Sequence, residues 1–224
     1  MRPSHFACTR DRLYGPRSNE GAFMADIPEG FFEGTGMPDA GWWEALWPDP
    51  AMVLDKAGLR PGMEVVDLCA GDGWFTQIIA QRATHVFAVD IDRKLLALSQ
   101  TRLHENGIAN CSFIAGDAYD LQRLVGRAVD FVFLANAYHG VPDKPRLCRA
   151  IYDALVPGGV LAIVNWHARP REETKVLGEP RGPKTEMRMT PEETIASAAG
   201  SGLVFKETAE VSPYHYATMF QRPM

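Results

Sequence analysis

The sequence predicts an α/β protein with a doubly wound, mostly parallel seven-stranded sheet that ends in an antiparallel C-terminal hairpin. Three observations lead to this prediction. Short apolar segments alternate with amphipathic segments from Pro61 to Trp166, which is typical of βαβ units whose sheet is covered on both faces. A turn with two glycines follows the first apolar segment. Two β-branched and aromatic segments close the chain and favour a hairpin at the sheet edge.

The composition is that of an ordinary globular chain. It has 224 residues, of which 46% are hydrophobic and 23% charged, and a formal net charge of −5. This length suits one domain or at most two, with enough material for a core. A negative net charge argues against a binder of duplex nucleic acid, which normally shows a basic face. No apolar run approaches the roughly 18 to 20 residues that span a bilayer.

The N-terminal part is predicted to lie outside the regular domain. Residues 1–25 are irregular and lack the apolar stretch of a secretory signal, so they are expected to form a disordered or irregular extension. Residues 26–60, rich in glycine, proline and tryptophan, are predicted to form a lid segment, with residues 61–224 as the main domain. The four cysteines show no CxxC pair, which predicts a reduced, cytoplasmic protein and no metal site.

Each element is assigned from its periodicity and its boundary residues. Short β-branched apolar runs predict strands, and apolar stripes that stop at residues such as Gly107 predict helices. The predicted strands are 63–68, 84–90, 111–117, 129–137 and 160–166, and the predicted helices are 50–59, 74–83, 93–107 and 144–155, the last ended by the PGG run at 157–159.

The C-terminal third begins with a segment of a different kind. Residues 167–189 are rich in proline and charge and have no clean period, which predicts a long loop of the kind that often binds substrate. A helix is predicted over 190–202, because a threonine cap and a proline at the first helical position open it. The segments LVFKETAEV and YHYATMFQR are the predicted hairpin strands.

The turn in VVDLCAGDGWFTQIIA indicates a ligand site. In an open α/β sheet, ligands bind beyond the carboxyl ends of the strands. Gly71 and Gly73 allow positive φ and a close approach of the backbone to a ligand. A dinucleotide fingerprint needs a third glycine where Thr76 stands, and a phosphate loop needs a GK[ST] run. Because Asp72 also brings negative charge to the turn, we expect a ligand that is not strongly anionic there.

Acidic residues follow the first three predicted strands. Asp67 ends the first strand, Asp90 ends the second, and Asp117 follows the third. A carboxylate at the position of Asp90 accepts hydrogen bonds from a ribose diol, and Asp117 is placed to accept from the exocyclic amine of adenine. The matching ligand is an adenosine that carries a positive charge. The alternative is that these acids are ordinary loop residues or helix caps.

Five segments resemble, in order and spacing, the motifs of class I S-adenosylmethionine-dependent methyltransferases. They are VVDLCAGDGWFT, VFAVDID, GDAYDL, DFVFLANAYHGVPD and LVPGGVLAIVNW. The resemblance covers about residues 61–166 and implies a Rossmann-like methyltransferase fold, methyltransferase activity and S-adenosylmethionine as cofactor. It implies a donor site in which Asp67, Gly71 and Gly73 line the methionine side, Asp90 and Ile91 the ribose, Asp117 and Ala118 the adenine, and Asn136 the methyl group.

The resemblance does not identify the acceptor, because one fold serves many reactions. Enzymes that methylate amino groups of nucleic acids usually carry an Asn/Asp-Pro-Pro-aromatic motif where this chain has ANAY at 135–138. A small organic acceptor is therefore the predicted class. Two other functions stay open, namely a donor-binding protein without transferase activity and a nicotinamide-dependent oxidoreductase.

Candidate residues for catalysis and acceptor binding lie in three places. Tyr138 is predicted to orient the acceptor or to face the sulfonium, and His139 to act as a base, with packing or helix capping as the alternative. The predicted substrate contacts are Trp43, Trp47, His167, Arg181 and Arg188. For the tryptophans the alternative is docking of the N-terminal segment on the core. The loop cations favour an anionic acceptor, with a solvated charged loop as the alternative.

Overall fold

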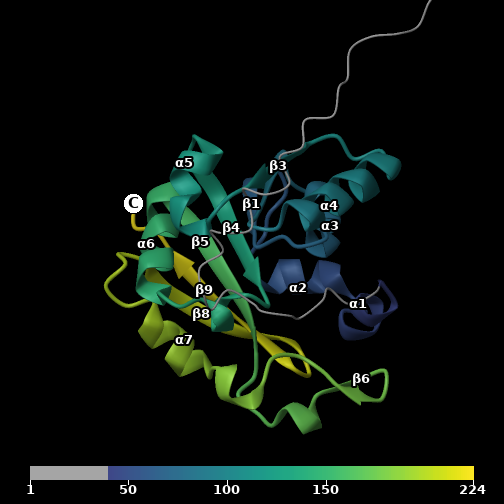
Figure 1. The fold of residues 1–224 in the computed structure, drawn as a ribbon. Coiled ribbons are helices and arrows are strands. Elements are labelled where there is room, and N and C mark those ends of the chain that lie inside the picture. Colours follow the sequence, from purple (N-terminus) through teal and green to yellow (C-terminus); the bar gives the residue numbers. More distant parts are fainter. Residues whose placement is uncertain (1–39) are drawn as a thin grey trace, which may run out of the picture.

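The computed structural model describes residues 40–224, so the predicted extension 1–25 and residues 26–39 of the predicted lid segment lie outside the described part. Its centre is a seven-stranded sheet in the order β3-β2-β1-β4-β5-β9-β8. The first five strands of that order are parallel, whereas β9 runs antiparallel to β5 and β8 antiparallel to β9. The predicted fold class is thereby confirmed (Figure 1).

The elements follow the order that the sequence predicts. The sheet consists of β1 Glu64–Leu68, β2 His85–Asp90, β3 Cys111–Ala115, β4 Val129–Ala135, β5 Leu155–Trp166, β8 Val204–Ser212 and β9 His215–Gln221. The helices are α1 Ala40–Leu46, α2 Pro50–Lys56, α3 Trp74–Ala80, α4 Arg93–Glu105, α5 Leu121–Val125, α6 Lys144–Ala154 and α7 Pro191–Ser197. Because the chain runs outward from β1 to β3 and then returns to β4 beside β1, the strand order reverses between β1 and β4.

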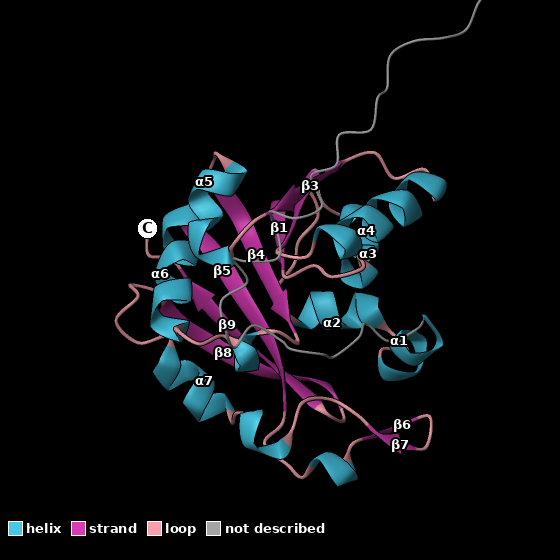
Figure 2. Ribbon diagram, in the orientation of Figure 1, coloured by secondary structure: helices cyan, strands magenta, loops and turns pink. Residues whose placement is uncertain are grey.

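Two apolar cores cover the two faces of the sheet. Alternate residues of β1 point to opposite faces, so Val65 belongs to one core and Val66 to the other. The first core includes side chains of α1, α2 and α3, and the second includes side chains of α5 and α6. Figure 2 shows these helices on the two sides of the sheet. Both faces of each central strand are buried, which explains why these strands are continuous apolar runs in the sequence.

The PGG run at 157–159 does not end a helix, contrary to the prediction from the sequence. Helix α6 already ends at Ala154, and β5 begins at Leu155 and includes the run. The register with β4 shifts between Val129 and Phe131, which marks a bulge, and Gly158 has a φ of +82°. Glycine accepts this conformation without strain, so the run serves the bulge within β5.

The C-terminal hairpin is confirmed, but its strands are placed in an order that the sequence does not predict. The last strand, β9, pairs with β5 along its whole length, from Val160 with Gln221 to Trp166 with His215. Strand β8 forms the edge, and its residues 204–208 are exposed. Consequently the turn of this hairpin, and not the chain terminus, lies beside the carboxyl ends of the parallel strands.

The segment 167–189 is more ordered than the predicted loop. It contains a short hairpin of β6 Lys175–Val176 and β7 Glu179–Pro180, and two 3-10 turns, η3 Arg171–Glu173 and η4 Thr185–Met187. Two further 3-10 turns elsewhere, η1 Ala118–Asp120 and η2 Tyr138–Gly140, directly follow β3 and β4. Hydrogen bonds between backbone groups within this segment hold its conformation.

Helix α7 begins with the predicted threonine cap. The Thr190 hydroxyl accepts from the backbone N–H of Glu193 at 3.1 Å, and the Glu193 carboxylate accepts from the N–H of Thr190 at 2.7 Å. This reciprocal pair is a capping box, and Pro191 occupies the first turn.

We predict that Thr190→Ala lowers the free energy of unfolding by about 1 kcal/mol, because the first turn of α7 loses a hydrogen-bond acceptor. Urea unfolding followed by circular dichroism measures the change. Thr190→Ser keeps the hydroxyl and serves as the control, with stability close to that of the parent. Equal losses in both variants would contradict the capping role.

Candidate functional site

The carboxyl ends of β1 and β4 carry unusual backbone conformations. Cys69 after β1 and Asn136 after β4 both have a φ of +59°, and Gly71 and Gly73 in the turn have φ of +56° and +83°. The predicted positive φ at both glycines is confirmed. Asparagine enters this region more readily than cysteine does. The two central strands thus end in sharp turns at the point where strand order reverses, which is where open α/β sheets bind ligands.

Gly73 is required by packing between two helices. It precedes the first residue of α3, and a Cβ atom there would lie 2.0 Å from the Ser99 hydroxyl of α4. No side chain fits such a distance. The glycine therefore lets α3 and α4 approach each other behind the turn.

Asp90 connects the turn to the next two strands. Its carboxylate accepts from the backbone N–H of Gly71 at 2.8 Å and from that of Asp92 at 2.8 Å, one on each oxygen. Its backbone carbonyl accepts from the N–H of Gly116 beyond β3 at 3.0 Å. Each carboxylate oxygen keeps a further lone pair, so a ribose diol can still bind there. Burial raises the pKa of Asp90, and the two N–H donors oppose that shift.

The end of β3 carries Asp117 and Ala118, the two residues predicted for adenine. Asp117 accepts from the N–H of Tyr119 at 2.9 Å through one oxygen and so opens η1. The second oxygen has no role in that cap. Ala118 is buried beside it, and Ile91, next to Asp90, is half-buried. The structure thus places the four residues predicted for adenosine at the neighbouring ends of β2 and β3.

Asp67 is a buried acid inside the same cluster. It is 3% exposed, and its carboxylate accepts from the Thr76 hydroxyl at 2.6 Å. Burial raises the pKa of Asp67 to about 7, although the bond from Thr76 lowers it in part. Thr76 occupies the position of the third glycine in a dinucleotide fingerprint. This residue therefore serves the acid at the end of β1 instead of admitting a pyrophosphate.

The sequence suggests that Asp72 presents its negative charge to a ligand, but in the structure this charge is paired within the protein. Asp72 is 6% exposed, and its carboxylate pairs with the Arg102 guanidinium of α4 at 3.0 Å. The remaining acids still make the turn negative. Asp90, Asp67 and Asp117 all raise the pKa of the Cys69 thiol, after burial itself, so all three lie within electrostatic reach of one atom. A cationic ligand suits this environment.

Asn136 faces the same edge from β4. Its N–H donates to Val164 of β5 at 2.9 Å, which fixes the turn. Its side-chain Oδ1 is buried and has no hydrogen-bond partner among residues 40–224. A buried carbonyl oxygen without a partner costs about 1–3 kcal/mol. A ligand that supplies a donor or a polarised C–H group would relieve that cost.

The position of Tyr138 in the structure contradicts the prediction that this side chain contacts the acceptor. The side chain is fully buried in the second core, and its hydroxyl lies 2.8 Å from Ser197 Oγ of α7 and 3.4 Å from Cys148 Sγ of α6. Burial raises the pKa of Tyr138. The ring and hydroxyl therefore attach α7 to α6.

His139, its neighbour, remains a candidate at the site. It is 8% exposed, and burial lowers its pKa to about 4, while a hydrogen bond with Asn165 opposes the shift and the charges of Lys144 and Arg188 add to it. The imidazole is therefore neutral near pH 7. It is able to accept a hydrogen bond from an acceptor molecule, but it is a weak base.

The two candidate tryptophans, Trp43 within α1 and Trp47 directly after it, belong to the first core. Trp43 is 8% exposed and stacks with Trp74, and Trp47 is 1% exposed with its ring 5.4 Å from Phe75. The structure thus corrects the prediction of direct substrate contacts. The alternative, docking of the N-terminal segment on the core, describes their packing.

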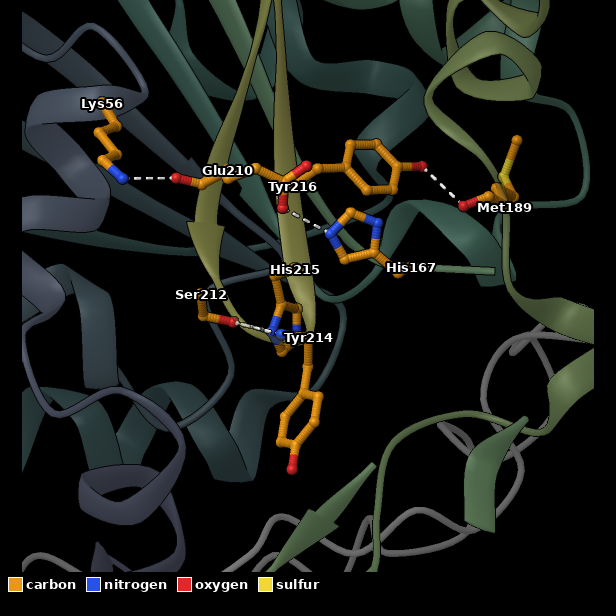
Figure 3. A network of polar contacts seen from close by, with 8 residues as sticks. All are labelled: Lys56, His167, Met189, Glu210, Ser212, Tyr214, His215 and Tyr216. Atoms are coloured by element: carbon orange, nitrogen blue, oxygen red, sulfur yellow. Dashed lines mark hydrogen bonds and ion pairs between the residues drawn. The ribbon is translucent and has the colours of Figure 1, made fainter. Parts of the chain in front are cut away.

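His167 is held in a polar network near the hairpin turn (Figure 3). Its Nε2 lies 2.8 Å from the Glu210 carboxylate of β8, and Lys56 of α2 donates to the Glu210 backbone carbonyl at 2.6 Å. The His167 side chain, which was predicted to contact substrate, is therefore already bonded to Glu210 of the same chain. Tyr216 completes the network with its hydroxyl 2.9 Å from the Met189 carbonyl.

His215 is a residue that the sequence analysis misses. It is fully buried, its ring lies 4.3 Å from that of Trp47 and 4.1 Å from that of Trp166, and its Nδ1 is 2.8 Å from Ser212 Oγ. Burial lowers its pKa well below the usual value. No local motif marks this histidine, because its position depends on the pairing of β9 with β5.

Arg181 and Arg188 differ in their surroundings although both belong to the segment 167–189. Arg181 is half-buried, whereas Arg188 is 6% exposed and stacks on Trp166, with 5.1 Å between its Cζ and the ring centroid.

Among the described residues, none of the helices has the length and hydrophobicity of a membrane-spanning segment.

The central region is similar to methyltransferase domains. Residues 65–159 match the family described as a methyltransferase domain. The ubiquinone/menaquinone biosynthesis C-methyltransferase UbiE of Shewanella sp. strain ANA-3 is 30% identical over 125 residues, which are 54% of this chain and 49% of that protein. UbiE of Vibrio campbellii is 29% identical over 126 residues, 54% and 47% of the two chains. The chain therefore spans about half the length of these relatives.

Solved structures share the fold at lower identity. A SAM-dependent methyltransferase from Aquifex aeolicus has a TM-score of 0.70 and 20% identity over 82% of this chain and 94% of its own. The [4+2]-cyclase SpnF has a TM-score of 0.65 and 17% identity over 87% of each chain. Similarity at this identity concerns the fold alone, and the two names show that it accommodates different reactions.

We predict that Asp67→Asn removes a pH dependence of stability. Folded Asp67 keeps its proton up to about pH 7, whereas the unfolded chain releases it near pH 3.8. The folded state therefore holds more protons in that window, and its stability falls as pH rises through it, by at most about 4 kcal/mol. Urea unfolding of both proteins at pH 4, 5, 6 and 7 measures the difference, in which the histidine contributions cancel. Parallel pH curves would show that Asp67 ionises normally.

We predict that Tyr138→Phe lowers the free energy of unfolding by about 1 kcal/mol, because Ser197 Oγ loses the Tyr138 hydroxyl and keeps only its bond to the Thr194 carbonyl. Calorimetry should give unchanged affinity for S-adenosylhomocysteine, since the hydroxyl lies in the core. Ser197→Ala tests the other end of the bond, and the two losses should not add in the double variant. Weakened ligand binding with full stability would restore Tyr138 to the site.

Proposed function

We propose that this chain, which its matched domain and its fold group with class I S-adenosylmethionine-dependent methyltransferases, methylates a small organic molecule. The cluster of Asp67, Asp90 and Asp117 at the ends of β1, β2 and β3 is the observation that supports this most strongly. It offers acceptors for a ribose and an adenine amine and a negative environment for a sulfonium. Arg102, the cation at the turn, is already paired with Asp72, which disfavours a pyrophosphate.

Each residue of the donor site has a role that follows from its contacts. Asp90 holds the ribose hydroxyls with the lone pairs that Gly71 and Asp92 leave open. Asp117 and Ala118 receive the adenine, and Asp67 lies on the methionine side. When bound, S-adenosylmethionine supplies a methyl group, activated by positive sulfur, for in-line displacement. A cation near Asp67 favours its ionised form and so opposes the rise in its pKa.

Transfer from such a donor requires alignment of the acceptor and exclusion of water more than it requires a nucleophilic residue. Asn136 and His139 follow β4 and are the groups placed to orient the acceptor. Asn136 offers a buried Oδ1 without a partner among the described residues, and neutral His139 offers a site for a hydrogen bond. A proton released by the acceptor passes to solvent or to a nearby weak base.

The acceptor is proposed to be a small molecule. The relatives named as ubiquinone/menaquinone C-methyltransferases suggest a ring-shaped acceptor. The cations of the segment 167–189 favour an acidic one. A donor-binding protein without transferase activity is the alternative, which the similarity to a cyclase keeps open. Formation of S-adenosylhomocysteine that depends on an added acceptor separates the two.

We predict that Asp90→Asn weakens binding of S-adenosylhomocysteine about 10- to 100-fold, because hydrogen bonds to a charged acceptor contribute roughly 1.5–3 kcal/mol. Isothermal titration calorimetry of the parent and the variant measures both dissociation constants. Asp120→Asn is the matched control, since Asp120 is an exposed acid paired with Arg123, and it should bind like the parent. Titration with NADH is the comparison, and binding of NADH alone would contradict the proposal.

A further inference from the structure

The Arg188 guanidinium is a buried cation that the described structure does not neutralise. We propose that it binds an oxyanion of the methyl acceptor, a carboxylate in the simplest case. This inference rests on the proposed function, because it names the chemical class of the acceptor for the same site. The sequence analysis expects an anionic acceptor from the loop cations together, whereas this inference assigns the anion to the side chain of Arg188.

The contacts of Arg188 are all with neutral groups. Its Nε donates to the Pro183 carbonyl at 3.2 Å, and its Nη2 donates to the Thr174 hydroxyl and to the Arg181 carbonyl, both at 2.9 Å. Its Cζ lies over the Trp166 ring, 5.1 Å from the centroid. These bonds hold the guanidinium in one orientation and leave Nη1, which is buried and has no partner among the described residues.

No acid balances this charge within the part of the chain that the structure describes. None of the ion pairs of residues 40–224, taken to 4.0 Å, includes Arg188. Burial lowers the pKa of Arg188 most, Arg171 lowers it further, the exposed Glu172 opposes the shift, and Arg169 adds a smaller lowering. A buried cation without a counter-ion is expensive, and an oxyanion on Nη1 would offset the cost with a charge-assisted bond.

A second donor lies in the same segment. Arg181 Nε is also buried without a partner among the described residues, and its carbonyl is already bonded to Arg188. The segment thus holds two guanidinium donors without a partner among the described residues, and the Arg181 backbone carbonyl is bonded to the same guanidinium as the proposed anion. Lys184, in contrast, is exposed and has no comparable surroundings.

Arg188 also lies close to the proposed acceptor position. Its charge lowers the pKa of His139, which follows β4, and that of His215 at the start of β9. It stacks on Trp166, the last residue of β5. The guanidinium is therefore within electrostatic reach of the strand ends that flank Asn136, whereas the three acids of the donor site belong to β1, β2 and β3. An acceptor anion and a donor cation would each meet the opposite charge.

The test uses the full-length protein saturated with S-adenosylhomocysteine and detects the Nε–Hε signals of its arginine side chains by ¹⁵N NMR at constant ionic strength. The probes are acetate and benzoate, each compared with its neutral isostere, acetamide or benzamide, and inorganic phosphate. We expect a saturable shift of the Arg188 signal with the carboxylates and at least a tenfold weaker response to the amides. Saturation by phosphate at lower concentration would assign the oxyanion to a phosphate ester.

Variants separate a binding role from a structural one. Arg188→Met should lose the saturable response, and Arg188→Lys should weaken it because lysine cannot form the planar pair. Lys184→Gln removes the same charge from the same segment and should respond like the parent. S-adenosylhomocysteine should bind Arg188→Met within about twofold of the parent, which shows that the domain is folded.

Two results would overturn the inference. One is an Arg188 signal in the parent that does not saturate with any carboxylate or phosphate, and the other is an equal response to acids and amides. Neither depends on a variant, so a folding defect of Arg188→Met does not affect them. Failure of the parent to bind S-adenosylhomocysteine would instead contradict the proposed function.

Discussion

The donor site depends on the carboxylate of Asp90. It accepts from Gly71 in the turn after β1 and from Asp92 before α4, while the carbonyl of the same residue accepts from Gly116 beyond β3. One side chain and its backbone thus fix three loops relative to one another. Because the carboxylate uses one lone pair on each oxygen for these bonds, it can organise the site and still bind a ribose.

Charge is distributed unevenly along the carboxyl edge of the sheet. Acids gather at the ends of β1, β2 and β3, where Asp67 is buried deeply enough for its pKa to rise to about 7. At the other end, beyond β5 and β9, Arg188 is buried without an acid. Burying the charge of these acids or of Arg188 costs free energy, and a ligand of opposite charge beside each would offset that cost. The polarity of the edge therefore favours a cationic donor beside an anionic acceptor.

Aromatic packing determines how the peripheral segments meet the sheet. Trp47, directly after α1, and Trp166 of β5 enclose the His215 ring, and the Arg188 guanidinium lies over Trp166. The N-terminal helices, the hairpin turn and the segment 167–189 thus share one cluster. A change in any of them would shift the others, so the acceptor side of the edge is built from parts that are distant in the sequence.

The sequence by itself determined the fold and the position of the residues proposed for the donor side of the site. The alternation of strands and helices, the positive φ at Gly71 and Gly73 and the acids after three strands are local patterns, and parallel strands necessarily bring their carboxyl ends to one edge. The acceptor side was decided by the tertiary structure. Tyr138 and Trp47 turned out to be core residues, and the buried His215 was not predicted at all, because burial and lost hydrogen-bond partners depend on contacts between distant segments. Local spacing carries no record of such contacts, whereas it does record the period of a strand or the cap of a helix.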